Sequence, residues 1–355
     1  MSISCGQNFT VTIDDSGCVW WFGAVRNNHD SLPSCTRIPV ELNTNGVKIK
    51  CVASWQDLIL FVGEDGSAYF QGMLGSFAYN PFNQFVALSN IVQVDCGKDH
   101  GVFLDSHGVC YGIGRNVKNC LVSKGESLYM QPVILEGLEN ITQVSCGVEN
   151  SIFLNSDGQV FGRGANGFKQ LSTKAPNEFG LVHIEFPEFI HFISFGGFHL
   201  LALSDSGNVW GLGSCNNAQL GTGESTGFQG IPSKAKFEEE NFILAIAAGQ
   251  SHSLAVDVEN NLWIFGKSYF HDKVFSTPRK LTEVENVQTL PRRGIYGFLV
   301  KADDNIHVFS NKEFEDKFGP RAKINSKLPN KWSSHNNVIG TNIYWRRSSK
   351  KSARK

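Results

Sequence analysis

The stretch SCGVENSIFLNSDGQVFGRG, residues 145–164, is the clearest copy of a short glycine-punctuated pattern in this chain. Two β-prone runs, 151–154 and 159–161, flank the sequence Asn155-Ser156-Asp157-Gly158. Asp-Gly between two such runs predicts a β-hairpin, because glycine adopts positive φ without a Cβ penalty. A single hairpin is only marginally stable in water, so we expect it to pack against further copies.

Further copies run along nearly the whole chain. Aligned on the first glycine, which we call the anchor, the copies begin near residues 6, 54, 97, 147, 196, 249 and 294. In six copies the turn residue follows the anchor by 11 positions, whereas the window from Ser54 to Gly66 has one extra residue. Asn260 and Asn305 replace the turn glycine, and asparagine also tolerates the left-handed conformation.

A second regularity follows each turn. Three positions after the turn residue the seven copies carry Trp20, Tyr69, Tyr111, Phe161, Trp210, Trp263 and Val308. A repeat of roughly 40–50 residues built from short strands and turns is typical of a β-propeller. We expect the large side chains to pack between neighbouring blades and the glycines to serve turns and close packing within a blade. The predicted fold class is all-β, with a propeller over residues 1–345.

The ends of the chain suggest how the ring closes. Proline-led segments such as 132–147 lead into the next anchor, but the first anchor lacks one because the sequence opens at MSISCG. Residues 319–340 contain a proline-led segment of the same kind. We expect this C-terminal segment to supply the missing first strand, which would remove the exposed edges of an open sheet.

Charge separates the propeller from a basic tail. The net charge is −1, and residues 346–355 contribute +6, which leaves −7 for residues 1–345. A block of like charges favours disorder, and it would serve as a solvated tail, a nuclear import signal or a weak nucleic-acid contact. Phosphorylation of Ser348, Ser349 or Ser352 would weaken it. Its basic residues are Arg346, Arg347, Lys350, Lys351, Arg354 and Lys355.

The composition predicts no cofactor, metal or membrane span. No run of 18 apolar residues and no signal-peptide pattern is present. Nine cysteines include no C-x-x-C pair, and Cys5, Cys96 and Cys146 precede anchors, where we expect small core residues. The glycine-rich runs lack a following helix, so a phosphate loop is not expected. Reduced thiols favour the cytoplasm or nucleus.

Two windows resemble the repeats of the regulator of chromosome condensation family. Ala247-Ala248-Gly249, His252 and Ser253 fit the first half of that repeat. The second half is matched by Trp210, Gly211, Gly213, Asn216, Gln219, Leu220 and Gly221. The resemblance implies a seven-bladed propeller of four-stranded blades. The family's founding member is a guanine-nucleotide exchange factor for the small GTPase Ran, and other members are adaptors or regulators of other GTPases.

The resemblance implies a partner-binding face beside the anchors. Its candidate residues here are Asp57, Asp99, His100, Glu149, His199 and His252. The founding member's exchange signature is incomplete, because the nearest match, residues 114–125, lacks its second Asp and its Leu-Gly-Arg. The histidines have a structural alternative, a hydrogen bond to the backbone of a neighbouring blade. The loops 24–38, 115–130, 165–186, 214–230 and 267–277 are further candidate binding surfaces.

The predicted function is therefore binding of a protein partner. One hypothesis is contact with a Ran-like small GTPase that promotes nucleotide exchange, which needs no covalent catalysis. The alternative is a non-catalytic nuclear or cytoplasmic scaffold or adaptor. The basic tail would add a contact to an import receptor or nucleic acid. A monomer is expected.

Overall fold

The structure is a computed structural model of the 355-residue chain. It describes residues 3–5, 9–23, 36–55, 58–74, 77–174, 180–238, 241–268, 273–282, 284, 286–290, 298–302 and 305–309. Apart from one short 3-10 helix, η1 (Val117–Asn119), the regular structure in these ranges is β-strand. No helix within them is long and apolar enough to cross a membrane.

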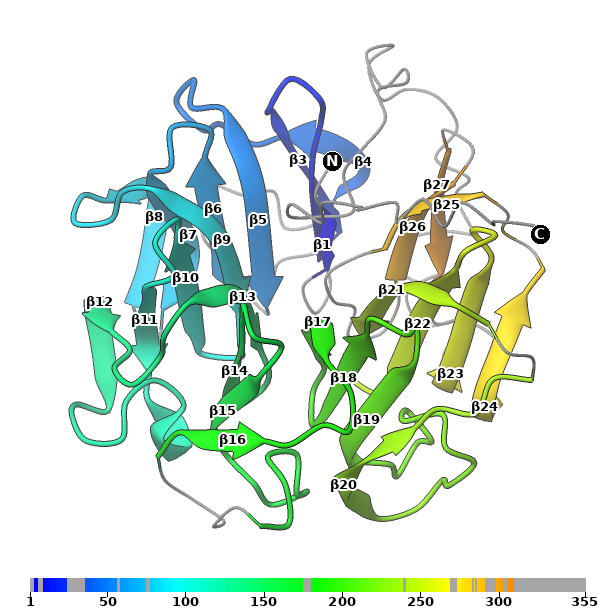
Figure 1. The fold of residues 1–355 in the computed structure, drawn as a ribbon. Helices are drawn as coiled ribbons and strands as arrows, with labels where there is room; N and C mark the ends of the chain where they lie inside the picture. The colour runs from blue at the N-terminus through cyan, green and yellow to red at the C-terminus, as the bar shows by residue number, and fades with distance from the viewer. Residues whose placement is uncertain are drawn as a thin grey trace, which may run out of the picture.

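Consecutive strands form a series of antiparallel sheets, which Figure 1 shows arranged around a centre. The first three sheets are β1 (Ile3–Cys5), β2 (Phe9–Ile13), β3 (Val19–Gly23), β4 (Thr36–Glu41); β5 (Ile49–Trp55), β6 (Leu58–Gly63), β7 (Ala68–Leu74), β8 (Phe77–Phe85); and β9 (Ile91–Cys96), β10 (His100–Asp105), β11 (Cys110–Arg115), β12 (Leu128–Ile134). The next three are β13 (Ile141–Cys146), β14 (Asn150–Asn155), β15 (Val160–Gly164), β16 (Val182–Ile184); β17 (Ile190–Phe195), β18 (His199–Ser204), β19 (Val209–Ser214), β20 (Phe228–Lys234); and β21 (Ile243–Ala248), β22 (His252–Asp257), β23 (Leu262–Ser268), β24 (Lys273–Leu281). The last sheet is β25 (Val287–Thr289), β26 (Phe298–Ala302), β27 (Asn305–Phe309).

The all-β propeller is confirmed, but the expectation of seven four-stranded blades is wrong. Six sheets have four strands, and the last sheet has three in the part of the chain that the structure describes. We number the six complete sheets as blades 1 to 6. The premise for ring closure also fails at the N-terminus, because β1 already supplies the first strand of blade 1. β1 lies against β26 of the three-stranded sheet. Residues 319–340 lie outside the described residues.

The predicted hairpins form at every described turn between second and third strands. Gly158 has a φ of 75°, and Asn260, in the equivalent place, has a φ of 64°. An aspartate tethers several of these turns. Asp257 Oδ1 accepts the backbone N–H groups of Glu259 and Asn261, and its Oδ2 accepts the indole N–H of Trp263 at 2.8 Å. The large side chain three positions after the turn residue is thus fixed to the turn itself.

The strand register moves the second anchor. Leu58 pairs with Gly72 as His100 pairs with Gly114, so Leu58 takes the position of His100 in its blade. The residue three positions earlier is Trp55, not Ser54. Trp55 is followed by Gly66 at the regular spacing, so the extra residue predicted in this copy is not there. A buried tryptophan stands where the other copies have glycine, so the sequence alignment did not recognise Trp55 as the anchor position.

A bulge that the sequence analysis did not predict recurs in the outer strands. In blade 3, Gly112 pairs with Val133 and Gly114 pairs with Tyr129, so three residues of β12 lie opposite Ile113. The same shift occurs in β4, β8, β20 and β24. Each bulge contains a proline: Pro39, Pro81, Pro132, Pro232 and Pro278. A bulged edge without a free N–H is a poor template for a further strand.

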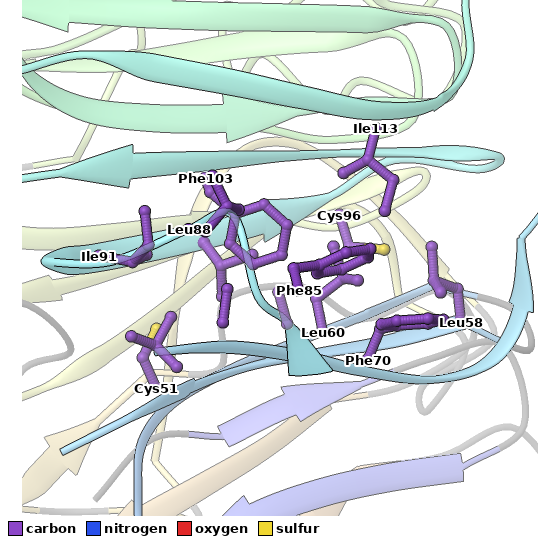
Figure 2. Packing of buried hydrophobic residues seen from close by; sticks show 14 of the residues in the cluster. Cys51, Leu58, Leu60, Phe70, Phe85, Leu88, Ile91, Cys96, Phe103 and Ile113 are labelled. Carbon is purple, nitrogen blue, oxygen red and sulfur yellow. The ribbon is translucent and has the colours of Figure 1, made fainter. Parts of the chain in front are cut away.

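The core lies between neighbouring sheets. Figure 2 shows the cluster between blades 2 and 3, where the rings of Phe70 and Phe85 stack at 4.2 Å and Phe85 meets Phe103 edge-on at 5.7 Å. Trp263 of blade 6 belongs to a cluster that includes Leu201 of blade 5. The expected packing between blades is therefore confirmed. The expectation for Cys5, Cys96 and Cys146 is also confirmed, because all three are buried core residues.

Candidate functional site

The connections between strands divide the six blades into two faces. The anchor face carries the loops between first and second strands, called anchor loops, and the loops between third and fourth strands, called outer loops. The two are joined within a blade, as when Arg115 N–H donates to the Asp99 carbonyl at 2.7 Å. The turn face carries the hairpin turns and the linkers between blades. These are joined as well, as when Ser156 N–H donates to the Asn140 carbonyl at 3.0 Å.

Neighbouring anchor loops meet closely on the anchor face. Gly197 N–H donates to the Gly249 carbonyl at 3.1 Å, and Val148 N–H donates to the Gly197 carbonyl at 3.3 Å. A Cβ built on Gly196 would lie 2.1 Å from the Gly249 carbonyl oxygen. The same atom on Gly97 would lie 2.5 Å from the Gly147 carbonyl oxygen. Successive blades therefore exclude side chains at these anchors, a contact between blades that the sequence analysis did not expect.

The three candidate histidines begin the second strands of their blades and are buried. His100, His199 and His252 are 1%, 0% and 2% exposed. His199 Nε2 lies 2.9 Å from Ser253 Oγ in the next blade. His100 Nε2 lies 3.1 Å from Ser151 Oγ and 3.2 Å from the Asn150 carbonyl oxygen. The rings of His100 and His199 contact the neighbouring blade rather than the surface, which fits the structural alternative.

We call the contact between the His199 ring and Ser253 of the next blade, and its equivalent between His100 and Ser151, the latch. The hydrogen-bond donors of the His199 latch can be assigned. Ser253 Oγ donates its proton to the Gln219 carbonyl at 2.7 Å, so His199 must donate Nε2–H to Ser253. Burial, aided by His252, lowers the pKa of His199 to about 3, and burial lowers the pKa of His252 to about 4. Both imidazoles therefore stay neutral at physiological pH. The contact with Ser253 holds His199 in the Nε2–H tautomer.

The acidic candidates lie closer to solvent. Asp99 and Glu149 occupy the same anchor-loop position in blades 3 and 4, and both side chains are half-buried. Phe198 and Ser251 hold this position in blades 5 and 6. The ring of Phe198 contacts the ring of Phe168 at 5.0 Å. The anchor face thus offers two carboxylates and then an aromatic pair, an arrangement that could bind a protein surface carrying cations beside an apolar side chain.

The outer loops that begin beside these residues are fixed by their own side chains. Asn166 Oδ1 accepts the Leu171 N–H at 2.9 Å, and its Nδ2 donates to the Ser172 carbonyl at 3.0 Å. Asn116 makes the equivalent contacts to Leu121 and Val122. These loops therefore present a defined surface over 116–122 and 166–172.

Some predicted site residues lie outside the described residues, and some residues of the site were not predicted from the sequence. Asp57 and the basic residues of 346–355 lie outside the described residues. Asn150 takes the histidine position in blade 4, where its Nδ2 donates to the Ala165 carbonyl at 2.7 Å. Ser151 and Ser253 were not proposed as latch residues, although a serine directly follows the histidine position in both copies. Among the described residues, no three His, Cys, Asp or Glu side chains gather in a way that could hold a metal ion.

The two faces differ in charge. On the described turns and linkers the exposed carboxylates are Asp15, Glu64, Asp65, Glu136, Glu139, Asp157, Asp205, Glu238 and Glu259, against exposed Lys48 and Lys236. Glu238 lies 3.7 Å from Arg279, and Glu185 is paired with Lys174 of the preceding outer loop, so it is not counted here. On the described anchor and outer loops, charged side chains of both signs are mixed: Lys98, Asp99, Arg115, Lys118, Lys124, Glu126, Glu149, Lys169, Lys174 and Glu224. The turn face is therefore strongly acidic, and the anchor face is not.

Comparison with known proteins identifies the repeats. The family described as regulator of chromosome condensation (RCC1) repeat matches residues 206–256, and a second description of that repeat matches residues 141–170. A segment of 73 residues is 38% identical to Ras guanine nucleotide exchange factor C of Dictyostelium discoideum. That match covers 19% of this chain and 5% of the relative.

Solved structures share the fold over most of the chain. Human WBSCR16 superposes with a TM-score of 0.74 at 19% identity, over 85% of this chain and 87% of the other. Prp20p of Saccharomyces cerevisiae, studied with its binding properties to Gsp1p and histones, gives a TM-score of 0.73 at 19% identity, over 89% and 84%. Yeast RCC1 (Prp20) is also known bound to Kap60, with the same TM-score and identity, over 89% and 82%. The predicted resemblance to RCC1 repeats is confirmed.

Proposed function

The chain is a β-propeller that carries RCC1 repeats, and we propose that its anchor face binds a small GTPase and promotes release of the bound nucleotide. The observation that carries the proposal is the pair Asp99 and Glu149, half-buried carboxylates at the same position of adjacent blades. Repeats of this family and the segment similar to a Ras exchange factor support the choice of partner class. Prp20p, which shares the fold, has been studied for binding to Gsp1p.

The mechanism proposed is differential binding. An exchange factor lowers the affinity of the GTPase for nucleotide by binding the nucleotide-free form more tightly than the loaded form. No bond in the protein forms or breaks. Asp99 and Glu149 would pair with cations of the GTPase, and Phe198 with Phe168 would receive an apolar side chain. The buried histidines act indirectly, because they hold the anchor loops of adjacent blades in register.

The test is release of a fluorescent GDP analogue from Ran and from a panel of other small GTPases. We expect faster release from one member when the protein is added. Asp99→Ala and Glu149→Lys should each slow that release at limiting protein concentration. Glu139→Lys changes an exposed acid on the turn face and serves as the matched control. No acceleration with any GTPase would overturn exchange activity and leave a scaffold or adaptor.

A further inference from the structure

The acidic turn face contains an apolar patch at blades 4 to 6. Phe189, Phe242 and Val258 are 48%, 45% and 59% exposed, although each is a large apolar side chain. Phe189 and Phe242 end the linkers into blades 5 and 6. The equivalent residues of the three preceding linkers are Lys48, Asn90 and Asn140. Aromatic rings thus replace polar side chains in two consecutive blades, on the same face.

Close contacts connect the patch into one continuous surface. A Cβ on Gly158 would lie 2.7 Å from the Phe189 ring, which places that ring over the turn containing Asp157. Phe242 covers Gly207 in the same way, beside Asp205.

The backbone extends this surface around the ring. Asp205 N–H donates to the Phe189 carbonyl at 3.2 Å, and Val258 N–H donates to the Phe242 carbonyl at 3.0 Å. Glu259, exposed, follows Val258 directly. The patch therefore alternates carboxylates with apolar side chains across three blades. We call this surface, formed by Asp157, Phe189, Asp205, Phe242, Val258 and Glu259, the acidic-aromatic patch.

We propose that the acidic-aromatic patch binds residues 343–355 of the same chain. That segment reads IYWRRSSKKSARK, three apolar residues followed by a block of +6. The apolar end complements Phe189 and Phe242, and the basic end complements the carboxylates, with arginine and lysine also attracted to exposed aromatic faces. From Phe309, the last described residue, to Ile343 there are 34 positions, a length that spans up to about 110 Å when extended. The segment can therefore reach the turn face.

Docking within one chain follows from concentration as well as chemistry. A tethered segment meets its site at an effective concentration in the mM range, so weak contacts suffice. Charge carries much of the attraction, and phosphorylation of Ser348, Ser349 or Ser352 would oppose it. The basic segment would then become available to other acidic partners. This proposal uses the turn face and does not depend on GTPase binding by the anchor face.

The test is carbodiimide crosslinking of carboxylates to lysines in the full chain, read by mass spectrometry. We expect Lys350, Lys351 and Lys355 to join Asp157, Asp205 and Glu259 within one molecule, at a yield independent of protein concentration. Raising the salt from low to molar concentration should lower the yield about tenfold, because the Debye length falls to about 3 Å. Two outcomes would overturn the proposal: crosslinks to Glu64 and Asp65 as frequent as those to the patch carboxylates, or no crosslinks from these lysines to the propeller.

Variants separate the patch from general attraction. Phe189→Ser with Phe242→Ser should lower the crosslink yield several-fold, whereas Val86→Ser removes an apolar residue 88% exposed elsewhere on the turn face and should not. Tyr344→Ser with Trp345→Ser keeps every lysine and leaves the described propeller unchanged, and it should lower the yield similarly. A mixture of isotope-labelled and unlabelled chains that yields mainly mixed crosslinks would contradict docking within one chain.

Discussion

Two residues at one anchor explain why glycine recurs there. At Gly196 the neighbouring Gly249 carbonyl and the His199 ring occupy the space that a Cβ would need. The side chain is excluded by the next blade and by the histidine of its own blade, and not by a strained backbone, since Gly196 is not among the glycines with positive φ. Glycine therefore recurs at the anchors because the contacts between blades leave no room for a side chain there.

Gly196→Ala is expected to destabilise the fold. The methyl group would push the two anchor loops apart, and overpacking of this kind costs about 1–3 kcal/mol. Gly167→Ala is the matched control, because nothing lies within 4 Å of its built Cβ and its φ is not positive. The control should be neutral or slightly stabilising. Urea unfolding measures both, and equal midpoints for the two variants would contradict the steric account.

The buried histidines make stability depend on pH. The folded pKa values of His199 and His252, about 3 and about 4, lie below the ordinary value of 6.5. The unfolded chain therefore binds more protons than the folded protein below pH 6.5. As the pH decreases from 6.5, the free energy of unfolding decreases until the pH reaches the folded-state pKa values. From pH 7.5 to pH 5 each histidine should remove about 2 kcal/mol of unfolding free energy.

His199→Gln tests this dependence. Glutamine keeps an N–H donor for Ser253 but does not titrate, so the variant should lose about 2 kcal/mol less than the wild type between the same pH values. Thermal unfolding over a pH series gives the comparison. Parallel pH profiles for the two proteins would mean that His199 is not the titrating group.

At the scale of elements, side chains join strands that do not pair through their backbones. Gln143 in β13 donates Nε2–H to the Ile193 carbonyl at 2.7 Å and accepts the Ile193 N–H at 2.9 Å. Gln93 in β9 makes the same two contacts with Val144. The first strands of neighbouring blades are thereby held in register by an amide side chain that imitates a backbone pair.

Gln143→Leu should therefore destabilise more than its size change suggests. It leaves the Ile193 N–H and carbonyl buried without this partner, at a cost of about 1–3 kcal/mol per group. Gln131→Leu alters an exposed glutamine in β12 and should change stability by less than about 0.5 kcal/mol. Denaturant unfolding of the two variants measures the difference as a shift in midpoint, provided that the dependence of the unfolding free energy on denaturant concentration is unchanged. A neutral Gln143→Leu would show that the inter-strand bonds add nothing net.

Sequence reasoning found the hairpins because their signals are local. Turn residues such as Gly158 and Asn260 must adopt positive φ, and only a few residue types do so readily. The second anchor was misplaced because Trp55 breaks the local pattern while the register keeps it. Two other features depend on partner strands, which no single stretch of sequence reveals. They are the bulges that contain Pro132 and its equivalents, and the hydrogen bonds between Gln143 and the Ile193 backbone.

The candidate site was predictable in position but not in exposure. The anchor loops do carry Asp99 and Glu149 on one face, as the repeat spacing indicates. The depth of His199 could not be read from the sequence, because its partner Ser253 lies 54 positions away in the next blade. Tertiary packing decides whether a conspicuous polar residue meets a partner protein or a neighbouring strand.

For the whole molecule, the division of charge between faces suits the anchor and turn faces to the two different roles proposed for them. A mixed-charge face with an aromatic pair suits a folded protein partner, and an acidic face with exposed rings suits a basic segment. The two proposals therefore predict separable effects of substitutions on opposite faces. Variants of the anchor face should alter GTPase contact and leave crosslinking of 343–355 unchanged, and variants of the acidic-aromatic patch should do the reverse.

The most direct measurement is the affinity of the full-length protein for the responsive GTPase, nucleotide-free and GDP-loaded, with the wild type, Glu149→Lys and Glu139→Lys. The account predicts that the wild type binds the nucleotide-free form at least about tenfold more tightly, a coupling of about 1.4 kcal/mol. Glu149→Lys should lose this preference, and Glu139→Lys should keep it. Equal affinity for the two nucleotide states, or a loss that follows the turn-face variant instead, would contradict the assignment of exchange activity to the anchor face.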